Sequence, residues 1–284
     1  MRIPRKFAQP QKYDQTLARQ LHQRLEEDEF INLLKGRTLF RNVAPTRLPL
    51  TTLEEISSAV EIMRLPKNRP LEFGPVDSLY EIISGYVKIY DRAPLGAEGG
   101  RQDLKQRRAL LAWRVPGELL GDFSFAFPDH DPADQIVATD ECQLLMIPTV
   151  TVRRLAQSYP QIYLNIAGNL AAKAIKTRVR ALVLRLPNIN SMIARIFLEF
   201  LAERGYDQEI NRGRAKVVNG SFHVKDIAAF LGYKYHRTQS GVHALIEAKL
   251  LGHYPEHNKK SGRFVIRDEK RLRKYLEEQS KLSE

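Results

Sequence analysis

The sequence is poor in the residues that build disulfide frameworks, metal clusters and membrane spans. Its 284 residues include one cysteine, Cys142, so a single chain can form neither an internal disulfide nor an all-cysteine zinc or iron–sulfur site. No stretch approaches the ~18 uncharged apolar residues of a membrane-spanning helix. Residues 1–12 lack the apolar core of a signal peptide. We therefore expect a soluble, cytoplasmic protein without a membrane partner.

The sequence also lacks the local signatures of the common enzyme classes. It contains no glycine-rich dinucleotide loop, no Walker loop, no His-Glu-x-x-His motif and no Ser/His/Asp constellation. Five of the seven histidines instead lie together within residues 211–267. These absences favour a protein that is not an enzyme.

Charge is unevenly distributed along the chain, which carries a net charge of +12. Residues 43–150 hold 16 acidic and 11 basic side chains, whereas residues 211–267 hold 11 basic and 3 acidic ones. The length corresponds to about two domains of ~150 residues, and the 43% apolar content is that of a folded protein. A basic unit after an acidic one suggests an anionic polymer as partner. A basic surface kept only for solubility is the alternative that composition leaves open.

Short strand-like segments fill the first half of the chain. From about residue 48 to 147, β-rich runs alternate with glycine and proline. Residues 79–90 predict a strand pair bent at Gly85, and residues 107–115 and 142–147 predict two more strands. Many short strands at this spacing are typical of a small antiparallel barrel or sandwich.

A longer apolar period begins after Pro160. Ile162, Ile166 and Leu170 start a stripe that predicts one long helix ending near residue 186, before a proline. Such a helix needs a partner to cover its stripe, and a second copy of the chain is favoured over the chain's own barrel. We therefore expect a homodimer with Ile166 and Leu170 at the seam.

A helix and two hairpins are predicted beyond the long helix. The helix is capped by Asn188 or Asn190 and ends at Gly205. Residues 217–224 contain an Asn-Gly pair, which is the strongest short hairpin signal. Residues 257–266 predict the second hairpin.

Residues 224–250 carry the pattern on which the functional prediction depends. A first helix ends at Gly232, which permits a tight turn, and a second helix begins within about four residues. Ile227 and Leu231 lie one turn apart on the first helix, and Ala228 is small where the two helices would cross. This spacing is typical of a helix-turn-helix, whose second helix enters the major groove of DNA.

Polar side chains crowd the start of this second helix and the hairpin beyond it. Two core helices joined by a loop would explain the apolar positions, but not this cluster of donors for phosphates and base edges. The candidate DNA-contacting residues are Lys225, Lys234, Tyr235, His236, Arg237, Gln239, Ser240, His243, Lys259, Lys260 and Arg263.

Two expectations refine this set. We expect His236, Arg237 and Ser240 to face base edges in the groove, and the basic hairpin to contact phosphates. Gly241 lies inside the second helix, where glycine costs about 1 kcal/mol relative to alanine. That position predicts close packing on another helix, or a bend.

The order of these parts resembles the cyclic-AMP receptor/FNR (Crp/Fnr) family of bacterial transcription regulators. LYEIISGYVKIY is similar to the family's strand pair around a glycine, and VPGELLGDFSF to its turn and phosphate-binding cassette. PNINSMIARIFLEFLAERG resembles the helix that opens the DNA-binding half, and IAAFLG followed by VHALIEAKLL resembles the recognition unit. The resemblance covers about residues 38–280.

This resemblance implies an α+β fold. It divides the chain into an N-terminal extension (1–40), helical over residues 13–36; a β-roll of the cyclic-nucleotide-binding, jelly-roll type (41–150); a dimerisation helix (151–187); and a C-terminal winged helix-turn-helix (188–284). It also implies a transcription regulator whose partners are double-stranded DNA, a second copy of the chain and RNA polymerase.

The sensor half departs from the family pattern at the positions that hold a cyclic phosphate. The family's arginine and following serine or threonine fall at Pro132 and Ala133, and no Lys or Arg occurs from Val115 to Val152. A buried phosphate without a cation loses most of its charge-assisted hydrogen bonding. We therefore expect an effector other than cyclic AMP, or none. By resemblance, an effector pocket would involve Gly121, Asp122, Phe123, Ser124 and Thr177.

No cofactor is predicted, and one alternative function stays open. Cys142 and the Trp113 strand are expected to fill the core, and His130 is the only histidine in residues 43–186. The alternative is a regulatory module that responds to a cyclic nucleotide or a dinucleotide and acts on a protein partner. Such modules keep the nucleotide cassette and lack a winged helix, which is the reverse of the pattern seen here.

Overall fold

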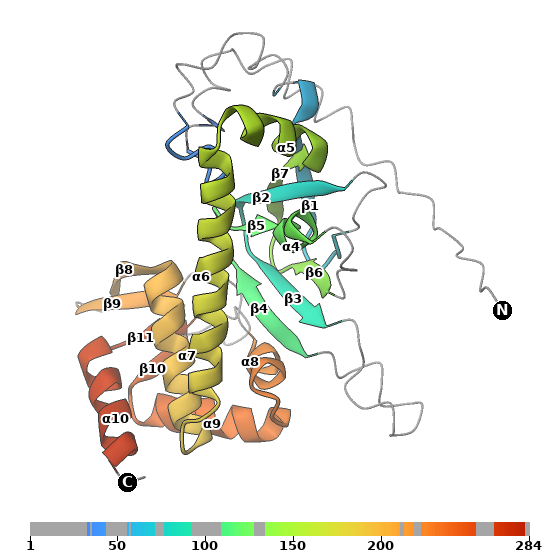
Figure 1. Cartoon of the computed structure of the whole chain (residues 1–284). Helices are drawn as coiled ribbons and strands as arrows, with labels where there is room; N and C mark the ends of the chain where they lie inside the picture. Colours follow the sequence, from blue (N-terminus) through green and yellow to red (C-terminus); the bar gives the residue numbers. More distant parts are fainter. Residues whose placement is uncertain are drawn as a thin grey trace, which may run out of the picture.

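The computed structural model describes residues 33–34, 36–43, 56, 58–71, 77–91, 109–127, 134–210, 213–218, 223–253 and 264–281. Figure 1 shows a β-roll, a long helix alongside it, and a helical unit with its own small sheet at the other end of that helix. The predicted α+β fold class, a cyclic-nucleotide-binding-like roll followed by a helix-turn-helix unit, is confirmed.

Two antiparallel sheets form the roll. One has the strand order β1-β7-β2-β5 and the other the order β4-β3-β6. The strands predicted near residues 110 and 145 are present as β4 and β7. The bounds are β1 Glu61–Leu65, β2 Ser78–Ser84, β3 Val87–Asp91, β4 Leu110–Arg114, β5 Leu119–Leu120, β6 Asp134–Ala138 and β7 Cys142–Pro148.

Gly85 lies where the chain leaves one sheet and enters the other. β2 pairs with β5 and β7, whereas β3 pairs with β4 and β6, so the two strands predicted as a pair belong to different sheets. Gly85 has a φ of +83°, and a Cβ atom there would lie 2.6 Å from the backbone oxygen of Glu141. Glycine is therefore required at this crossing.

The segment before the roll is held by a buried carboxylate. The backbone N–H groups of Thr38 and Leu39 donate to Glu81, at 2.7 and 3.2 Å. Burial raises the pKa of Glu81, and these two hydrogen bonds oppose that shift. Phe40 is buried in a cluster with Leu79, Leu145 and Ile147 of the roll, which we call the sensor core. Most of the helix predicted over residues 13–36 lies outside the described residues.

Residues 151–187 were predicted to form a single dimerisation helix, but the structure has two helices in this region. α5 (Thr149–Ser158) and α6 (Gln161–Val183) are separated at Pro160. Ile166 is buried in the chain's own sensor core, and Leu170 packs against that core. The prediction that Ile166 lies at a dimer seam is therefore wrong, because an apolar period does not say which neighbour covers it. For Leu170, which is half-buried, it stays a prediction.

The C-terminal unit combines helices with a sheet of order β10-β11-β9-β8. The predicted hairpin at residues 217–224 is wrong, because β9 pairs with the earlier strand β8 and residue 224 already begins a helix. The C-terminal helix α10 was not predicted. The bounds are α7 Ile189–Arg204, β8 Gly205–Ile210, β9 Gly213–Val218, β10 Leu251–His253, β11 Phe264–Ile266 and α10 Glu269–Lys281.

In the parts of the chain that the structure describes, no helix is long and apolar enough to span a bilayer.

Two glycines with similar backbone conformation allow a matched test of the crossing between sheets. Gly85→Ala is expected to lower the free energy of unfolding by more than ~3 kcal/mol, because it adds a backbone clash to the left-handed strain. At Gly232, with a φ of +72°, an added Cβ atom would meet nothing within 4 Å, so Gly232→Ala should cost only about 1–2 kcal/mol. Urea unfolding followed by circular dichroism measures both. Equal losses would contradict the steric explanation.

Candidate nucleic-acid interface

The turn between two short helices has the geometry that the sequence predicted. α8 (Val224–Leu231) ends at Gly232, which adopts the left-handed conformation, and α9 (Tyr235–Glu247) begins three residues later. A reciprocal capping box between His223 and Asp226 starts α8. The apolar residues Ile227, Leu231, Val242 and Leu245 are buried between the helices and the rest of the unit.

One face of α9 points to solvent. His236, Ser240 and His243 are exposed at positions i, i+4 and i+7, so they lie along one side of the helix. Arg237 is also exposed, and its guanidinium lies over the ring of Tyr233 at 4.9 Å. Gln239 is half-buried. The α9 face, defined by His236, Ser240 and His243, is therefore free to contact a ligand along about two turns of helix.

Three other candidate DNA-contacting residues belong to α8 or to the start of α9. Lys225 on α8, and Lys234 and Tyr235 at the start of α9, are exposed. β10 (251–253) pairs with β11 (264–266), so only the second of these strands falls within the hairpin predicted over residues 257–266. Its tip, with Lys259, Lys260 and Arg263, lies outside the described residues.

Gly241 lies at a helix crossing. A Cβ atom on Gly241 would lie 2.7 Å from Cδ1 of Ile193 and 2.8 Å from Oδ1 of Asn190, both on α7. Of the two explanations that the sequence offered for this glycine, the structure has close packing on another helix.

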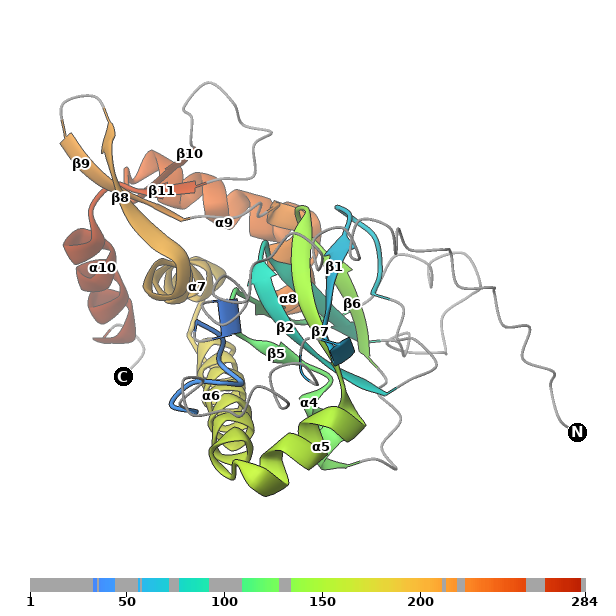
Figure 2. The same ribbon diagram turned by 90° about the horizontal axis from the view of Figure 1, so that it is seen from above.

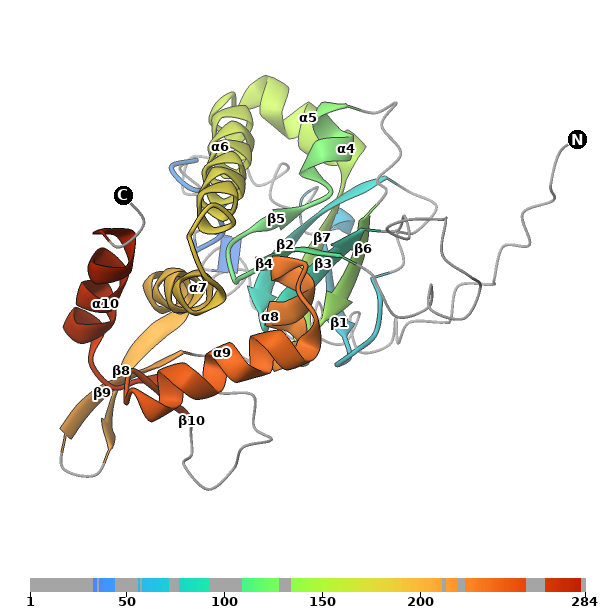
Figure 3. The same ribbon diagram turned by 90° about the horizontal axis from the view of Figure 1, so that it is seen from below.

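α8 is docked on the sensor by a buried ion pair. Lys88 of β3 donates to a carboxylate oxygen of Asp226 at 2.8 Å, and the two side chains are 10% and 5% exposed. Figure 3 shows α8 lying against the roll beside β3 and β4. Because a buried charge is costly when it is unpaired, moving α8 away from β3 would carry an energetic penalty.

Arg180 of α6 joins the same two parts. Its Nη1 donates to the carbonyl of Leu111 on β4 at 2.7 Å, and its Nη2 donates to the carbonyl of Phe230 on α8 at 2.8 Å. The guanidinium also lies over the Phe230 ring, 4.4 Å from its centroid. Burial lowers the pKa of Arg180. One side chain of the long helix therefore bridges the sensor and the helix-turn-helix.

Trp113 packs between the halves rather than inside the roll, where it was expected. Its ring meets Phe200 of α7 edge-on, with centroids 4.9 Å apart, and Phe230 of α8 at 4.5 Å. Leu110 and Trp113 of β4 share one buried cluster with residues of α7, α8 and α9. The neighbouring aromatic run on α4 (Asp122–Ala126) divides, with Phe125 buried and Phe123 55% exposed.

The residues predicted to form an effector pocket do not surround one site. Asp122 is buried and accepts two hydrogen bonds from Nζ of Lys173, each 2.6 Å long. Lys173 also donates to the carbonyl of Leu119, and burial lowers its pKa although Asp122 opposes this shift. Gly121 is in the left-handed conformation and Ser124 is half-buried beside Asp122 on α4.

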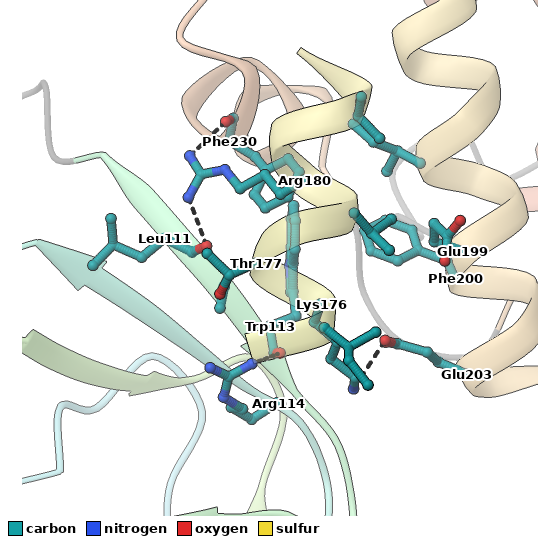
Figure 4. Close-up of a pocket in the computed structure, with 15 residues that line it drawn as sticks. Leu111, Trp113, Arg114, Lys176, Thr177, Arg180, Glu199, Phe200, Glu203 and Phe230 are labelled. Atoms are coloured by element: carbon teal, nitrogen blue, oxygen red, sulfur yellow. Dashed lines mark hydrogen bonds and ion pairs between the residues drawn. The ribbon is translucent and has the colours of Figure 1, made fainter. Parts of the chain in front are cut away.

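Thr177 instead lines a cavity of about 250 Å³ at the junction of the two halves. β4, α6, α7 and α8 supply its walls, and Figure 4 shows Arg180, Trp113 and Phe230 around it. None of the four effector candidates from residues 121–124 lines this cavity. No local pattern in the sequence signals it, because its walls come from four separate segments.

The chain resembles known proteins in structure but not in sequence. No protein-family profile matches the chain, and no curated protein matches it by sequence. Solved structures do match. FixK2 from Bradyrhizobium japonicum has a TM-score of 0.56 at 16% identity, over 76% of this chain and 96% of its own.

Two further structures agree. A CRP/FNR-family transcriptional regulator from Thermus thermophilus has a TM-score of 0.56 at 16% identity, over 76% of this chain and 98% of its own. CLP from Xanthomonas campestris, described as a regulator responsive to c-di-GMP, has 0.55 at 19%, over 78% of this chain and all (100%) of its own. The chain has the fold of the Crp/Fnr transcription regulators. The Thermus and Xanthomonas proteins are both described as regulators.

Proposed function

We propose that this Crp/Fnr-type protein is a sequence-specific DNA-binding transcription regulator that works as a homodimer. The observation that carries the proposal is the α9 face, which is exposed and polar, with exposed Lys234 and Arg237 at the start of the same helix and exposed Lys225 on α8. Imidazole and hydroxyl groups can contact base edges, while lysine and arginine side chains can neutralise phosphates. The second helix of this motif presents such a face to the major groove.

Dimerisation is assigned to a different face of α6 from the one predicted. Leu164, Ile175 and Leu182 are 63%, 64% and 54% exposed, although all three are large and apolar. With Gly168, Ala171 and Arg178 they form a stripe at alternating spacings of four and three residues, which is the repeat of a two-helix coiled coil. We call this the α6 stripe. A second copy of the chain is the partner that such a stripe suits.

The proposed regulator does not use cyclic AMP. Three cations contact the cassette-like segment: Arg153 donates to the backbone carbonyl of Phe125 at 2.8 Å, Lys176 pairs with Glu118, and Lys173 is neutralised in a buried ion pair by the carboxylate of Asp122. A phosphate would have to displace that carboxylate from an enclosed position. Together with the absence of Lys and Arg from Val115 to Val152, this supports an effector of another chemical class.

Base contacts and phosphate contacts should respond differently to substitution. His236→Ala is expected to weaken binding to an operator, selected from a pool of random duplexes, by ~1–3 kcal/mol, with little effect on random DNA. Lys234→Ala should weaken binding to both duplexes about equally and reduce the salt slope by about one. Salt titrations by fluorescence anisotropy measure both effects. Failure of the wild type to prefer any duplex would contradict the function, and equal losses on both duplexes would contradict this division of roles.

The α6 stripe can be tested without disturbing the sensor core. Ile175→Asp with Leu182→Asp should convert the dimer to a folded monomer, since carboxylates would meet across the seam. Val150→Asp, at a residue of α5 that is 71% exposed and off the stripe, is the matched control and should leave the dimer intact. Light scattering measures the mass. A dimer that survives the double substitution would exclude this seam.

A further inference from the structure

The cavity at the junction is lined by apolar side chains and by charged ones. Its apolar side chains include Trp113, Val179, Val183, Phe200 and Phe230. At about 250 Å³ it has the volume of roughly eight liquid waters at ~30 Å³ each. That space is at the small end of ligand sites and suits a single ring or a short branched chain.

Three cations of the described residues line the cavity, and two of them are already neutralised. Lys176 forms ion pairs with Glu118 at 3.1 Å and with Glu203 at 2.9 Å. Arg114 lies 4.0 Å from a carboxylate oxygen of Glu118. These groups leave little net charge on their side of the cavity.

Arg180 differs from the other two cations. Its two terminal nitrogens donate to the carbonyls of Leu111 and Phe230, which carry no charge. Its Nε is buried and, among the atoms of the described residues, has no hydrogen-bond partner. Within the same part of the chain no carboxylate forms an ion pair with it. An arginine stays charged in proteins, so this is a half-buried positive charge without a counter-ion among the described residues.

The carboxylates on the cavity wall do not supply that counter-ion. Glu203 is held by Lys176, and Glu199 is held by Arg195 at 2.7 Å, one helical turn earlier on α7. Neither therefore presents an uncompensated negative charge to an incoming anion. The cavity therefore combines apolar side chains, paired charges and one unneutralised guanidinium.

We propose that this cavity binds a small organic carboxylate whose apolar body is a single ring or a branched chain. The carboxylate accepts hydrogen bonds from the terminal N–H groups of the Arg180 guanidinium, and the body packs against Trp113, Phe200 and Phe230. The site is separate from the segment around Asp122 and Lys173. The proposal extends the proposed function, since it names the class of effector.

The position of Arg180 gives such a ligand access to both halves. The guanidinium that would bind the carboxylate is the one that ties Leu111 of β4 to Phe230 of α8. A carboxylate is a stronger acceptor than a neutral carbonyl, so the ligand competes with these two bonds. A bound ligand would therefore weaken the hydrogen bonds by which Arg180 holds α8 against β4.

The single tryptophan of the chain provides a direct readout, because Trp113 lines the cavity. Cyclohexanecarboxylate, which does not absorb where tryptophan does, is the probe, and its neutral carboxamide is the matched ligand. Titrated into the full-length protein, the carboxylate should change Trp113 fluorescence saturably with a Kd below ~1 mM. The carboxamide should bind at least about ten-fold more weakly. Cyclic AMP should leave this signal unchanged.

Three variants distinguish the contribution of the Arg180 charge to ligand binding from that of the cavity volume. Arg180→Gln should lower the affinity for the carboxylate by about ten- to a hundred-fold and remove its advantage over the carboxamide. Arg185→Gln, at an exposed arginine just beyond α6, should preserve both. Val179→Phe keeps the guanidinium and fills the cavity, so it should exclude both probes even if Arg180→Gln does not fold.

The proposal is overturned if the carboxylate gives no saturable change with the wild-type protein. It is overturned equally if the carboxamide binds as well as the carboxylate, or if Val179→Phe leaves binding intact. These titrations contain no DNA. If the carboxylate does not bind but the protein still binds its operator, the ligand site is excluded and the proposed function is unaffected.

Discussion

The position of the helix-turn-helix depends on the packing of Trp113. This residue belongs to the sensor strand β4, yet its ring lies against Phe200 of α7 and Phe230 of α8, with centroids 4.9 and 4.5 Å away. A single buried cluster therefore contains side chains from both halves of the molecule. The Lys88–Asp226 ion pair lies at the same contact. Separating the halves would expose aromatic surface and leave two charges unpaired, so the contact is both apolar and specific.

This shared core leaves the α9 face free while it fixes the helix that carries it. α8 is held from the sensor side, and α9 packs on α7 through Gly241, so the exposed side of α9 has one orientation relative to α6. Figure 2 shows α9 crossing the molecule, with α8 at the end of α9 that faces the roll. In the proposed function, a signal that displaces β4 or Arg180 therefore reaches the DNA-contacting face through α8, without a change inside α9.

The elements that the sequence predicted correctly depend on neighbouring residues. The turn at Gly232 was predictable because its signals lie within a few positions. Three expectations failed because they depended on distant partners. The Asn-Gly pair at residues 219–220 predicts a hairpin with a following strand, but β9 pairs with the preceding strand β8. The apolar period of α6 predicts a buried stripe but does not distinguish packing of Ile166 against the sensor core from packing against a second copy of the chain. Alternation along β4 could not say which face of that strand covers another domain. Lys88 and Asp226 are 138 positions apart, and no local pattern pairs them.

The most direct test of the shared core is scanning calorimetry of the full-length protein at fixed concentration. If the sensor and the helix-turn-helix unit share one core, the wild type should unfold in one transition whose calorimetric and van't Hoff enthalpies agree. Trp113→Ala should remove ~3–5 kcal/mol of packing and resolve the two halves into separate transitions. Two resolved transitions in the wild-type protein, or a single unshifted transition in Trp113→Ala, would contradict the account.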